Sequence, residues 1–368
     1  MSGRIVLFGA TGYTGRLTAR ALVERGARPV LAGRRPDPLA ALAAELGDGL
    51  ETATADVDRP ETVRALLTDG AVLLTTVGPF TRWGAVAIEA AIEAGAPYID
   101  STGEPPFIRR VFEEWSGPAA AAGVPLLTAM GYDWVPGNLA AALALERAGE
   151  RASRVEIGYF LTGSGGGFSG GTRASTIASM LERGYADRGG RLVGQPNGRS
   201  VRGFEVRGRT RQAISVSSSE HFAIPASYPN VRDVEAYLGW FGPMSRPMQA
   251  GSLLIDGVTR IPGARGALGA ALGRFAKGST GGPDAEARAA SGSHVLAIAR
   301  DDAGAALAEV RLEGVDGYTF TAGMLAWAAI RAAEGAIAGA GALGPAEAFG
   351  VESLRSGVED AGIREIDG

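Results

Sequence analysis

Short apolar runs alternate with amphipathic stretches over the first 150 residues. Six of these runs are typical of strands and cover residues 4–8, 28–33, 51–56, 71–77, 96–100 and 124–129. Between the first two, Leu17, Ala21 and Leu22 share one helix face, and Gly26 is a natural helix stop. Strands that alternate with helices predict a parallel sheet covered by helices. We therefore expect an α/β, Rossmann-type, doubly wound domain over residues 1–150.

The pattern changes after residue 150. Residues 154–161, 209–218, 233–240, 293–301 and 305–314 are typical of antiparallel strands, and "DDAG" at 301–304 indicates a hairpin turn. We expect a second, α+β domain on a mostly antiparallel sheet over residues 151–316, which serves substrate binding or dimerisation. Helices are predicted at 172–185 and, more weakly, at 266–276. Residues 317–368 are expected to pack back on the first domain through a long helix at 320–339.

The amino-acid composition excludes several kinds of catalytic and metal-binding site. The chain of 368 residues has 36 basic and 40 acidic side chains, no cysteine and two histidines. Nothing marks a nucleic-acid or membrane partner, a secretion signal or a membrane span, so we expect a cytoplasmic protein. No disulfide, thiolate nucleophile or cysteine-held metal is possible, and no metal site is predicted. Lys277, the only lysine, stands in a glycine-rich stretch, and His221 and His294 stand in strand-like contexts, so all three are more typical of structural than catalytic residues.

The stretch "GATGYTG" follows the first strand and opens a helix. Three glycines at a three-residue spacing in that context predict a dinucleotide-binding loop. The first glycine permits the turn, the second leaves room for a diphosphate, and the third lets helix and strand pack closely. The predicted cofactor-binding residues of this loop are Gly9, Ala10, Thr11, Gly12, Tyr13, Thr14 and Gly15. Glycines that serve only the turn are the alternative.

The end of the second strand indicates which dinucleotide binds. An NAD site favours a carboxylate there, whereas this chain has Gly33, Arg34 and Arg35, whose guanidinium groups pair with a 2′-phosphate. We predict NADPH, the alternative being that both arginines are solvated surface charges. Asp56, beside Val57, is placed to bind the adenine amino group or to cap a helix. The nicotinamide is expected at the end of the fourth strand, beside residues 77–79: Val77, Gly78 and Pro79.

Five motifs in order carry a resemblance: "GATGYTGR", "TTVGPF", "YIDSTGE", "GYDWVPGNL" and "SGGTRAS". Together they resemble the saccharopine dehydrogenase-like oxidoreductases, and most closely the branch that includes the trans-acting enoyl reductases. The resemblance implies a Rossmann domain, an α+β second domain, and NADPH as the reductant. Trp134, Gly137 and Asn138 depart from the pattern of the enoyl reductases, which leaves the substrate open.

The predicted catalytic residues are Tyr132 and Asp133. Tyr132 is the first candidate for proton donor, oriented by Asp133 or by the cofactor ribose. A tyrosine that only packs at the rim and an aspartate that only caps the next helix are the alternatives.

Further residues are assigned to the substrate. The loops after the fourth and fifth strands contribute Phe80 and Thr102, and the glycine-rich stretch 163–176 offers backbone donors for an anionic group. An aromatic and methionine cluster at 237–248 predicts an acyl pocket, with core packing or a dimer contact as the alternatives. The remaining predicted substrate residues are Gly170, Gly171, Thr172 and Trp240.

Three functions are consistent with these residues. The first is NADPH-dependent reduction of an activated C=C bond on an acyl thioester. The second is reduction of an imine or carbonyl, and the third is a redox sensor that binds NADPH without turnover. A homodimer is expected, with a small-molecule or carrier-bound acyl group as the substrate.

Overall fold

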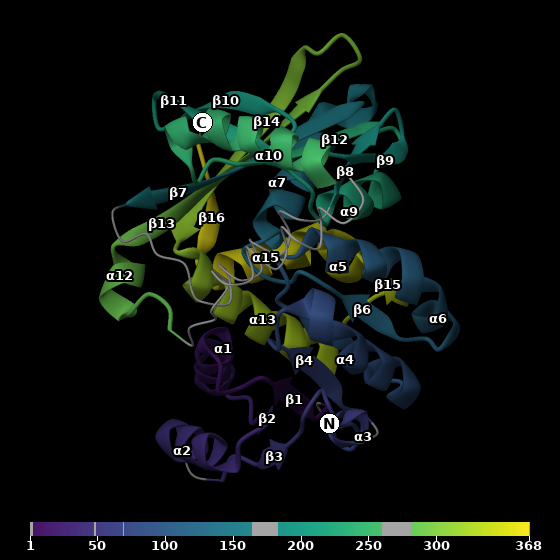
Figure 1. The fold of residues 1–368 in the computed structure, drawn as a ribbon, viewed down its shortest axis with the longest axis vertical. Helices are drawn as coiled ribbons and strands as arrows, with labels where there is room; N and C mark the ends of the chain where they lie inside the picture. The colour runs from purple at the N-terminus through teal and green to yellow at the C-terminus, as the bar shows by residue number, and fades with distance from the viewer. Residues whose placement is uncertain (1–2, 48, 69, 164–182, 260–280, 368) are drawn as a thin grey trace. The chain divides into compact units, whose positions relative to one another are not determined.

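The computed structural model describes residues 3–47, 49–68, 70–163, 183–259 and 281–367 (Figure 1). The chain divides into two compact units, Met1–Val135 with Gly317–Gly362, and Pro136–Asp316 with Ile363–Gly368. The first limit falls at residue 135, whereas the sequence analysis places it at 150, because the helix α7 (Val135–Ala148) groups almost entirely with the second unit.

The first unit contains a seven-stranded sheet of order β15-β6-β5-β4-β1-β2-β3, in which every neighbouring pair is parallel. The strands are β1 (Ile5–Phe8), β2 (Val30–Gly33), β3 (Thr52–Thr54), β4 (Val72–Thr75), β5 (Tyr98–Asp100), β6 (Pro125–Leu127) and β15 (Gly341–Ala342). All six predicted strands are confirmed, and only the two-residue β15 escaped prediction. β1, β2 and β4 are buried along their whole length, as parallel strands covered on both faces should be.

Helices cover this sheet. They are α1 (Tyr13–Glu24), α2 (Pro36–Leu46), α3 (Pro60–Arg64), α4 (Phe80–Ala94), α5 (Pro105–Arg110), the π-helical turn η1 (Val111–Trp115), α6 (Ser116–Ala121), α13 (Gly317–Ala333), α14 (Pro345–Phe349) and α15 (Val351–Asp360). One core cluster joins strand residues such as Val6 and Leu73 to Ile88 of α4 and to Phe107 of α5. The predicted helix at 320–339 corresponds to α13, which lies beside α1 in the same unit (Figure 1).

The second unit is built on a mixed, mostly antiparallel nine-stranded sheet. Its strands are β7 (Arg154–Gly163), β8 (Gly184–Arg188), β9 (Arg191–Gln195), β10 (Val201–Val206), β11 (Arg209–Val216), β12 (Asp233–Leu238), β13 (Ser291–Arg300), β14 (Ala306–Val315) and β16 (Ile363–Ile366). The predicted hairpin turn is confirmed between β13 and β14, where the Asp301 N–H donates to Ala305 O at 3.1 Å. The antiparallel assignment is wrong for one pair, because β12 and β7 run parallel.

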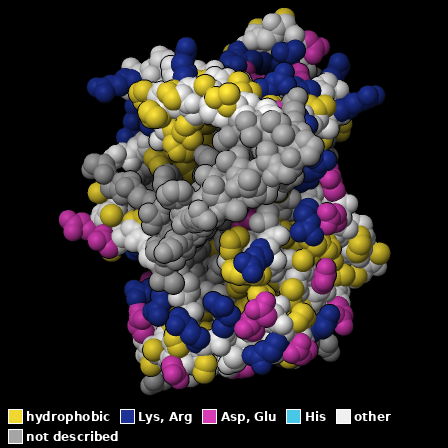
Figure 2. Space-filling view, in the orientation of Figure 1, with side chains coloured by type: hydrophobic (Ala, Val, Ile, Leu, Met, Phe, Trp, Pro, Cys, Tyr) yellow, Lys and Arg dark blue, Asp and Glu magenta, His cyan; other side chains and the backbone are white. Residues whose placement is uncertain are grey.

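The helices of the second unit are α7, α9 (Glu220–Ser227), α10 (Ser245–Thr259) and α12 (Ala285–Ala289), with 3₁₀ turns η2 (Gly149–Arg151) and η3 (Gly242–Met244). Most of the predicted helix at 172–185 and all of the one at 266–276 lie outside the described residues, and Gly184 and Tyr185 belong to β8. None of the helices that the structure describes has both the length and the apolar character to cross a bilayer. Figure 2 shows basic and acidic side chains interspersed over the part of its face where α1, α2 and α3 lie.

Candidate active site and dinucleotide-binding loop

The loop between β1 and α1 is shaped by close backbone contacts. Gly9 has a φ of +94°, which favours glycine, and its N–H donates to Ala32 O of β2 at 2.9 Å. A Cβ on Gly15 would stand 2.1 Å from Gly9 O, so only glycine lets α1 pack this closely on the loop. The roles assigned to the first and third glycines from the sequence therefore match the geometry of the turn.

Gly12 is the N-cap of α1 and is exposed. A Cβ there would meet only Gly9 O, at 3.3 Å, and the first turn of α1 has no acidic residue. An exposed glycine ahead of a helix N-terminus forms a cradle for a diphosphate, because the helix dipole and the backbone N–H groups both favour negative charge. Ala10 is buried beneath the loop, whereas Thr11, Tyr13 and Thr14 are partly exposed around it. The loop thus fits the predicted dinucleotide.

Arg34 and Arg35 follow β2 and are both exposed. Among the described residues neither guanidinium group has a hydrogen-bond or ion-pair partner, unlike Arg16 and Arg20 of α1, which both pair with Glu45. Gly33 is buried, and the Thr11 hydroxyl lies 3.9 Å from the position that a Cβ on Gly33 would take. Two unpaired guanidinium groups at this edge are suited to a 2′-phosphate.

The other predicted cofactor residues also lie at the carboxyl edge of the sheet. The Asp56 Oδ1 accepts from the Asp58 N–H at 3.1 Å, in a turn before α3, while Val57 packs on the core cluster beside it. Val77 follows β4 and also packs on the core cluster, and the Gly78–Pro79 peptide bond is cis. Contact of these residues with adenine or nicotinamide stays a prediction.

Asp100 joins the loops that follow β5 and β6. Its Oδ1 accepts from the N–H groups of Thr102 and Ala129 at 2.8 and 2.9 Å, and its Oδ2 accepts from the Thr128 hydroxyl at 2.9 Å. The side chain is fully buried, and burial raises the pKa of Asp100 to about 6 although these hydrogen bonds lower it. The carboxylate thus fixes both loops at one place on the sheet edge.

Asp133 lies in the loop after β6 and differs from Asp100 in its surroundings. In the part of the chain that the structure describes, its Oδ1 is excluded from water and has no hydrogen-bond partner. Burial raises the pKa of Asp133 to about 7. Gly103, after β5, makes room for the carboxylate, because a Cβ there would stand 2.9 Å from Asp133 Oδ2. The sequence analysis missed Gly103, which carries no signal of its own within "STGE".

Tyr132 is buried at the same edge, with 4% of its surface exposed. Its ring makes an edge-on contact with Phe320 of α13 at a centroid distance of 6.3 Å, and its N–H donates to the Thr321 hydroxyl at 2.9 Å. These contacts are consistent with a packing role, and the predicted part of Tyr132 in proton transfer stays a prediction.

Two predicted substrate residues of the first unit have structural partners. Phe80 belongs to the core cluster, and its N–H donates to Glu104 Oε1 at 2.9 Å. Thr102 is fully buried, and its hydroxyl accepts from the Glu104 N–H at 3.1 Å. Glu104 also accepts from the N–H and the hydroxyl of Thr81 and so caps α4 from a different loop, which the sequence analysis missed.

The remaining predicted substrate residues belong to the second unit. Trp240 follows β12 and is half-buried, and Gly170, Gly171 and Thr172 lie outside the described residues.

Gly137 and Asn138, which depart from the enoyl reductase pattern, lie inside the second unit. The Gly137 N–H donates to Tyr159 Oη at 3.0 Å, and Tyr159 donates in turn to Glu220 Oε1 at 2.6 Å. A Cβ on Gly137 would stand 2.0 Å from that phenol oxygen, so the position requires glycine. The Asn138 amide donates to the Ser219 hydroxyl at 3.1 Å. Both departures are thus explained by a buried polar network; the third, Trp134, is buried in the first unit.

The two histidines have internal partners. Burial lowers the pKa of His221 to about 4, and its Nδ1 lies 2.9 Å from the Ser218 hydroxyl. The Nδ1 of His294 lies 2.7 Å from Glu313 Oε1. Among the described residues no group of three or more His, Cys, Asp or Glu side chains could hold a metal ion.

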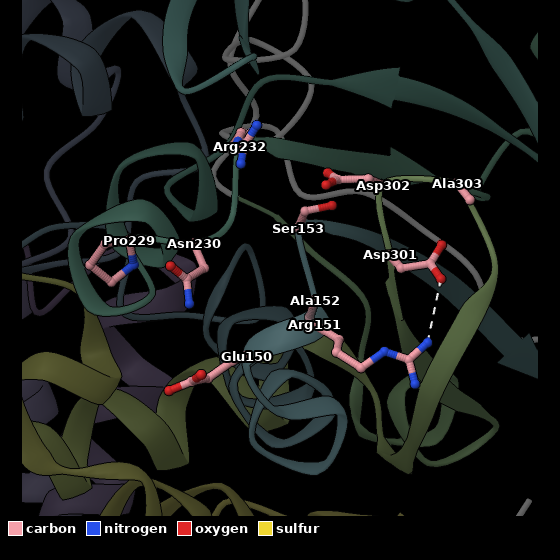
Figure 3. A pocket seen from close by; sticks show the side chains of 10 residues that line it. All are labelled: Glu150, Arg151, Ala152, Ser153, Pro229, Asn230, Arg232, Asp301, Asp302 and Ala303. Atoms are coloured by element: carbon pink, nitrogen blue, oxygen red, sulfur yellow. Dashed lines mark ion pairs between the residues drawn. The ribbon is translucent and has the colours of Figure 1, made fainter.

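One cavity of the second unit lies away from these motifs. It has a volume of about 600 Å³ and is lined by residues of η2, of the α9–β12 loop and of the β13–β14 turn (Figure 3). Arg151 and Asp301 form an ion pair there at 3.7 Å. None of the predicted site residues that the structure describes lines this cavity.

The fold and the loop define the class of protein. Residues 5–125 match the family described as "Saccharopine dehydrogenase NADP binding domain", which confirms the predicted NADPH and the predicted resemblance. Saccharopine dehydrogenase (L-Glu forming) from Saccharomyces cerevisiae has the same fold over 99% of both chains, with a TM-score of 0.58 and 14% identity. Residues 5–125 of this chain thus form an NADP-binding domain.

Several similar proteins are named for a particular activity. A protein of Mycobacterium tuberculosis provisionally named a trans-acting enoyl reductase is 40% identical over 185 residues, which is 48% of this chain and 43% of that protein. A trans-acting enoyl reductase of Mycobacterium leprae is 41% identical over 140 residues, 37% of this chain and 34% of that protein. The chain thus matches less than half the length of these relatives.

Proposed function

We propose that this chain is an NADPH-dependent reductase of the C=C bond in an enoyl thioester, with Asp133 as the proton donor. The names of the relatives support the reaction, and the surroundings of Asp133 support the donor. Asp133 is half-buried, and a carboxyl with a pKa near 7 is half protonated at neutral pH, which suits a general acid. The cofactor loop and Asp133 belong to the same compact unit and lie at the same edge of its sheet.

NADPH would be held by the β1–α1 loop and by Arg34 and Arg35, and when bound it would supply a hydride to the β-carbon. The two electrons of the C=C bond then shift toward the thioester carbonyl as an enolate. Asp133 transfers its proton to the α-carbon, so the product gains one hydride and one proton. The carboxylate left on Asp133 takes up a proton from solvent before the next turnover.

Asp133 is favoured over its neighbours because its Oδ1 has no hydrogen-bond partner among the residues that the structure describes. Asp100 accepts three hydrogen bonds that hold two loops, and loss of that carboxylate would disturb both. Tyr132 is packed against Phe320 and Gly317 of α13. Asp133 Oδ1, by contrast, has no such partner among the described residues, so its proton can move without breaking a hydrogen bond at that oxygen.

Asp133→Asn tests the donor, with Tyr132→Phe as the matched control. In Asp133→Asn we expect NADPH affinity to be kept and kcat with an enoyl thioester to fall by about 10²- to 10⁴-fold, the usual contribution of general acid catalysis. In the unsubstituted protein, kcat is expected to fall tenfold per pH unit above about pH 7, since the protonated acid is the active form. An unchanged rate in Asp133→Asn, or a loss that Tyr132→Phe reproduces, contradicts the assignment.

An imine or carbonyl reductase is the second candidate. It is supported by the matching domain, which is described from saccharopine dehydrogenase. NADPH consumption with an imine or a keto acid, but not with an enoyl thioester, favours this candidate. Binding of NADPH without consumption on any of these substrates favours a sensor.

The homodimer, the cytoplasmic location and the carrier-bound form of the substrate stay predictions.

A further inference from the structure

The helix α13 begins at the carboxyl edge of the first unit's sheet and contacts both halves of the proposed site. It packs beside α1 and against β1, β4 and β5 (Figure 1). Its first turn, Gly317–Thr321, meets Tyr13 of the dinucleotide loop and Gly131 and Tyr132 of the loop after β6. These two loops follow strands that two other strands, β4 and β5, separate in the sheet.

We propose that this first turn of α13 is a positioning element of the site: Tyr318 holds the dinucleotide loop through Tyr13, and Thr321 holds the loop that carries Asp133. The role of the second contact rests on the function proposed above. Neither Tyr318 nor Thr321 is placed in contact with the reacting atoms.

The contact with the dinucleotide loop is aromatic. The rings of Tyr13 and Tyr318 lie 5.1 Å apart at an angle of 88°, a favourable edge-to-face arrangement. Tyr13 is the first residue of α1, directly after the open glycine at the N-cap. A contact at this residue fixes the end of the helix whose backbone faces the diphosphate.

The contact with the loop that carries Asp133 consists of two hydrogen bonds made by one hydroxyl group. Thr321 Oγ1 accepts from the Tyr132 N–H at 2.9 Å and donates to Gly317 O at 2.7 Å. The two backbones approach closely, because a Cβ on Gly131 would stand 2.9 Å from Thr321 Cγ2, and one on Gly317 would stand 2.9 Å from Tyr132 Cδ1. The residue before Asp133 is thus fixed by both a hydrogen bond and close packing.

Two pairs of variants of the full chain separate these contacts. Tyr318→Ala removes the ring, whereas Tyr318→Phe keeps it. Thr321→Val removes the hydroxyl at nearly constant shape, whereas Thr321→Ser keeps it. Two measurements are made on each: NADPH affinity by fluorescence titration, and the pKa of Asp133 by carbon NMR of the cofactor-free protein, with Asp133→Asn used to assign the signal.

We expect Tyr318→Ala to weaken NADPH binding several-fold and to leave the Asp133 pKa unchanged, with Tyr318→Phe like the unsubstituted protein. We expect Thr321→Val to lower the Asp133 pKa toward the ordinary range, since a loosened loop admits water, with NADPH affinity kept and Thr321→Ser unchanged. Thermal unfolding checks that each variant folds; Tyr318→Leu and Thr321→Ala replace any that does not.

The proposal is overturned if Tyr318→Phe weakens NADPH as much as Tyr318→Ala, or if neither variant does. It is also overturned if Thr321→Val leaves the pKa of Asp133 in place. Both readouts are independent of turnover, so they remain valid if no enoyl thioester is reduced and the proposed function fails.

Discussion

Replacement of Arg34 and Arg35 by alanine tests whether these side chains bind the 2′-phosphate of NADPH. Both side chains are exposed, and among the described residues neither guanidinium group has a partner, so none of those residues competes with the phosphate for them. A hydrogen bond to a charged group contributes about 1.5–3 kcal/mol, and exposure places these at the lower end. Since about 1.4 kcal/mol corresponds to a factor of ten in affinity, each substitution should weaken NADPH about tenfold.

NADH lacks the 2′-phosphate, so its affinity should change by less than about twofold, a difference well below 1 kcal/mol. The assay is fluorescence titration of both nucleotides against the single variants and against the double variant. Raised ionic strength should weaken NADPH binding to the unsubstituted protein more than binding to the double variant, since exposed charges are screened by salt.

Arg20→Ala is the matched control. Arg20 is an exposed arginine of α1 in the same unit, and it already forms an ion pair with Glu45 of α2. It should leave both affinities unchanged. Equal losses for NADPH and NADH in the Arg34 and Arg35 variants would refute the reasoning, because the arginines would then act on something that both nucleotides share.

Two further predictions concern stability. Because burial raises the pKa of Asp133 to about 7, the folded state keeps a proton that the unfolded state releases near pH 4, and stability falls as pH rises between these values. Asp133→Asn should therefore raise Tm relative to the unsubstituted protein at pH 8 but not at pH 4. An equal shift at both pH values would contradict this. Gly137→Ala should lower the free energy of unfolding in urea by about 1–3 kcal/mol, since its Cβ would stand 2.0 Å from Tyr159 Oη. Part of this loss should disappear when Tyr159→Phe removes that oxygen. Fully additive losses in the two variants would exclude the clash as the cause.

The first unit could be predicted well because its signals are local. The central strands β1, β2 and β4 are short apolar runs, helices of suitable period follow them, and the three glycines stand at the junction of the first pair. The second unit was predicted less well. Its strands β8, β9 and β10 are rich in glycine and arginine and lack a regular alternation, and the parallel pairing of β12 with β7 joins segments far apart in the sequence.

The candidate site shows the same limit. The motif drew attention to Tyr132 and Asp133, but the roles of Gly103 and Thr321 depend on loops that meet only in the folded chain. Thr321 lies 189 residues after the Tyr132 N–H that it accepts from. No local pattern contains such a pairing, so the sequence alone could place the acidic residue but not its environment.

That environment distinguishes three carboxyl groups at one sheet edge. Glu104 accepts from two backbone N–H groups and a hydroxyl, and Asp100 does the same in a second loop. These hydrogen bonds join the loops after β4, β5 and β6, so both groups hold loops in place. Asp133 lies against Gly103 of the loop after β5, its Oδ1 has no partner among the described residues, and burial disfavours the charged form there. Under the function proposed above, Asp133 would therefore keep its proton until the hydride has moved, because the other two carboxyl groups are already bound by the loops.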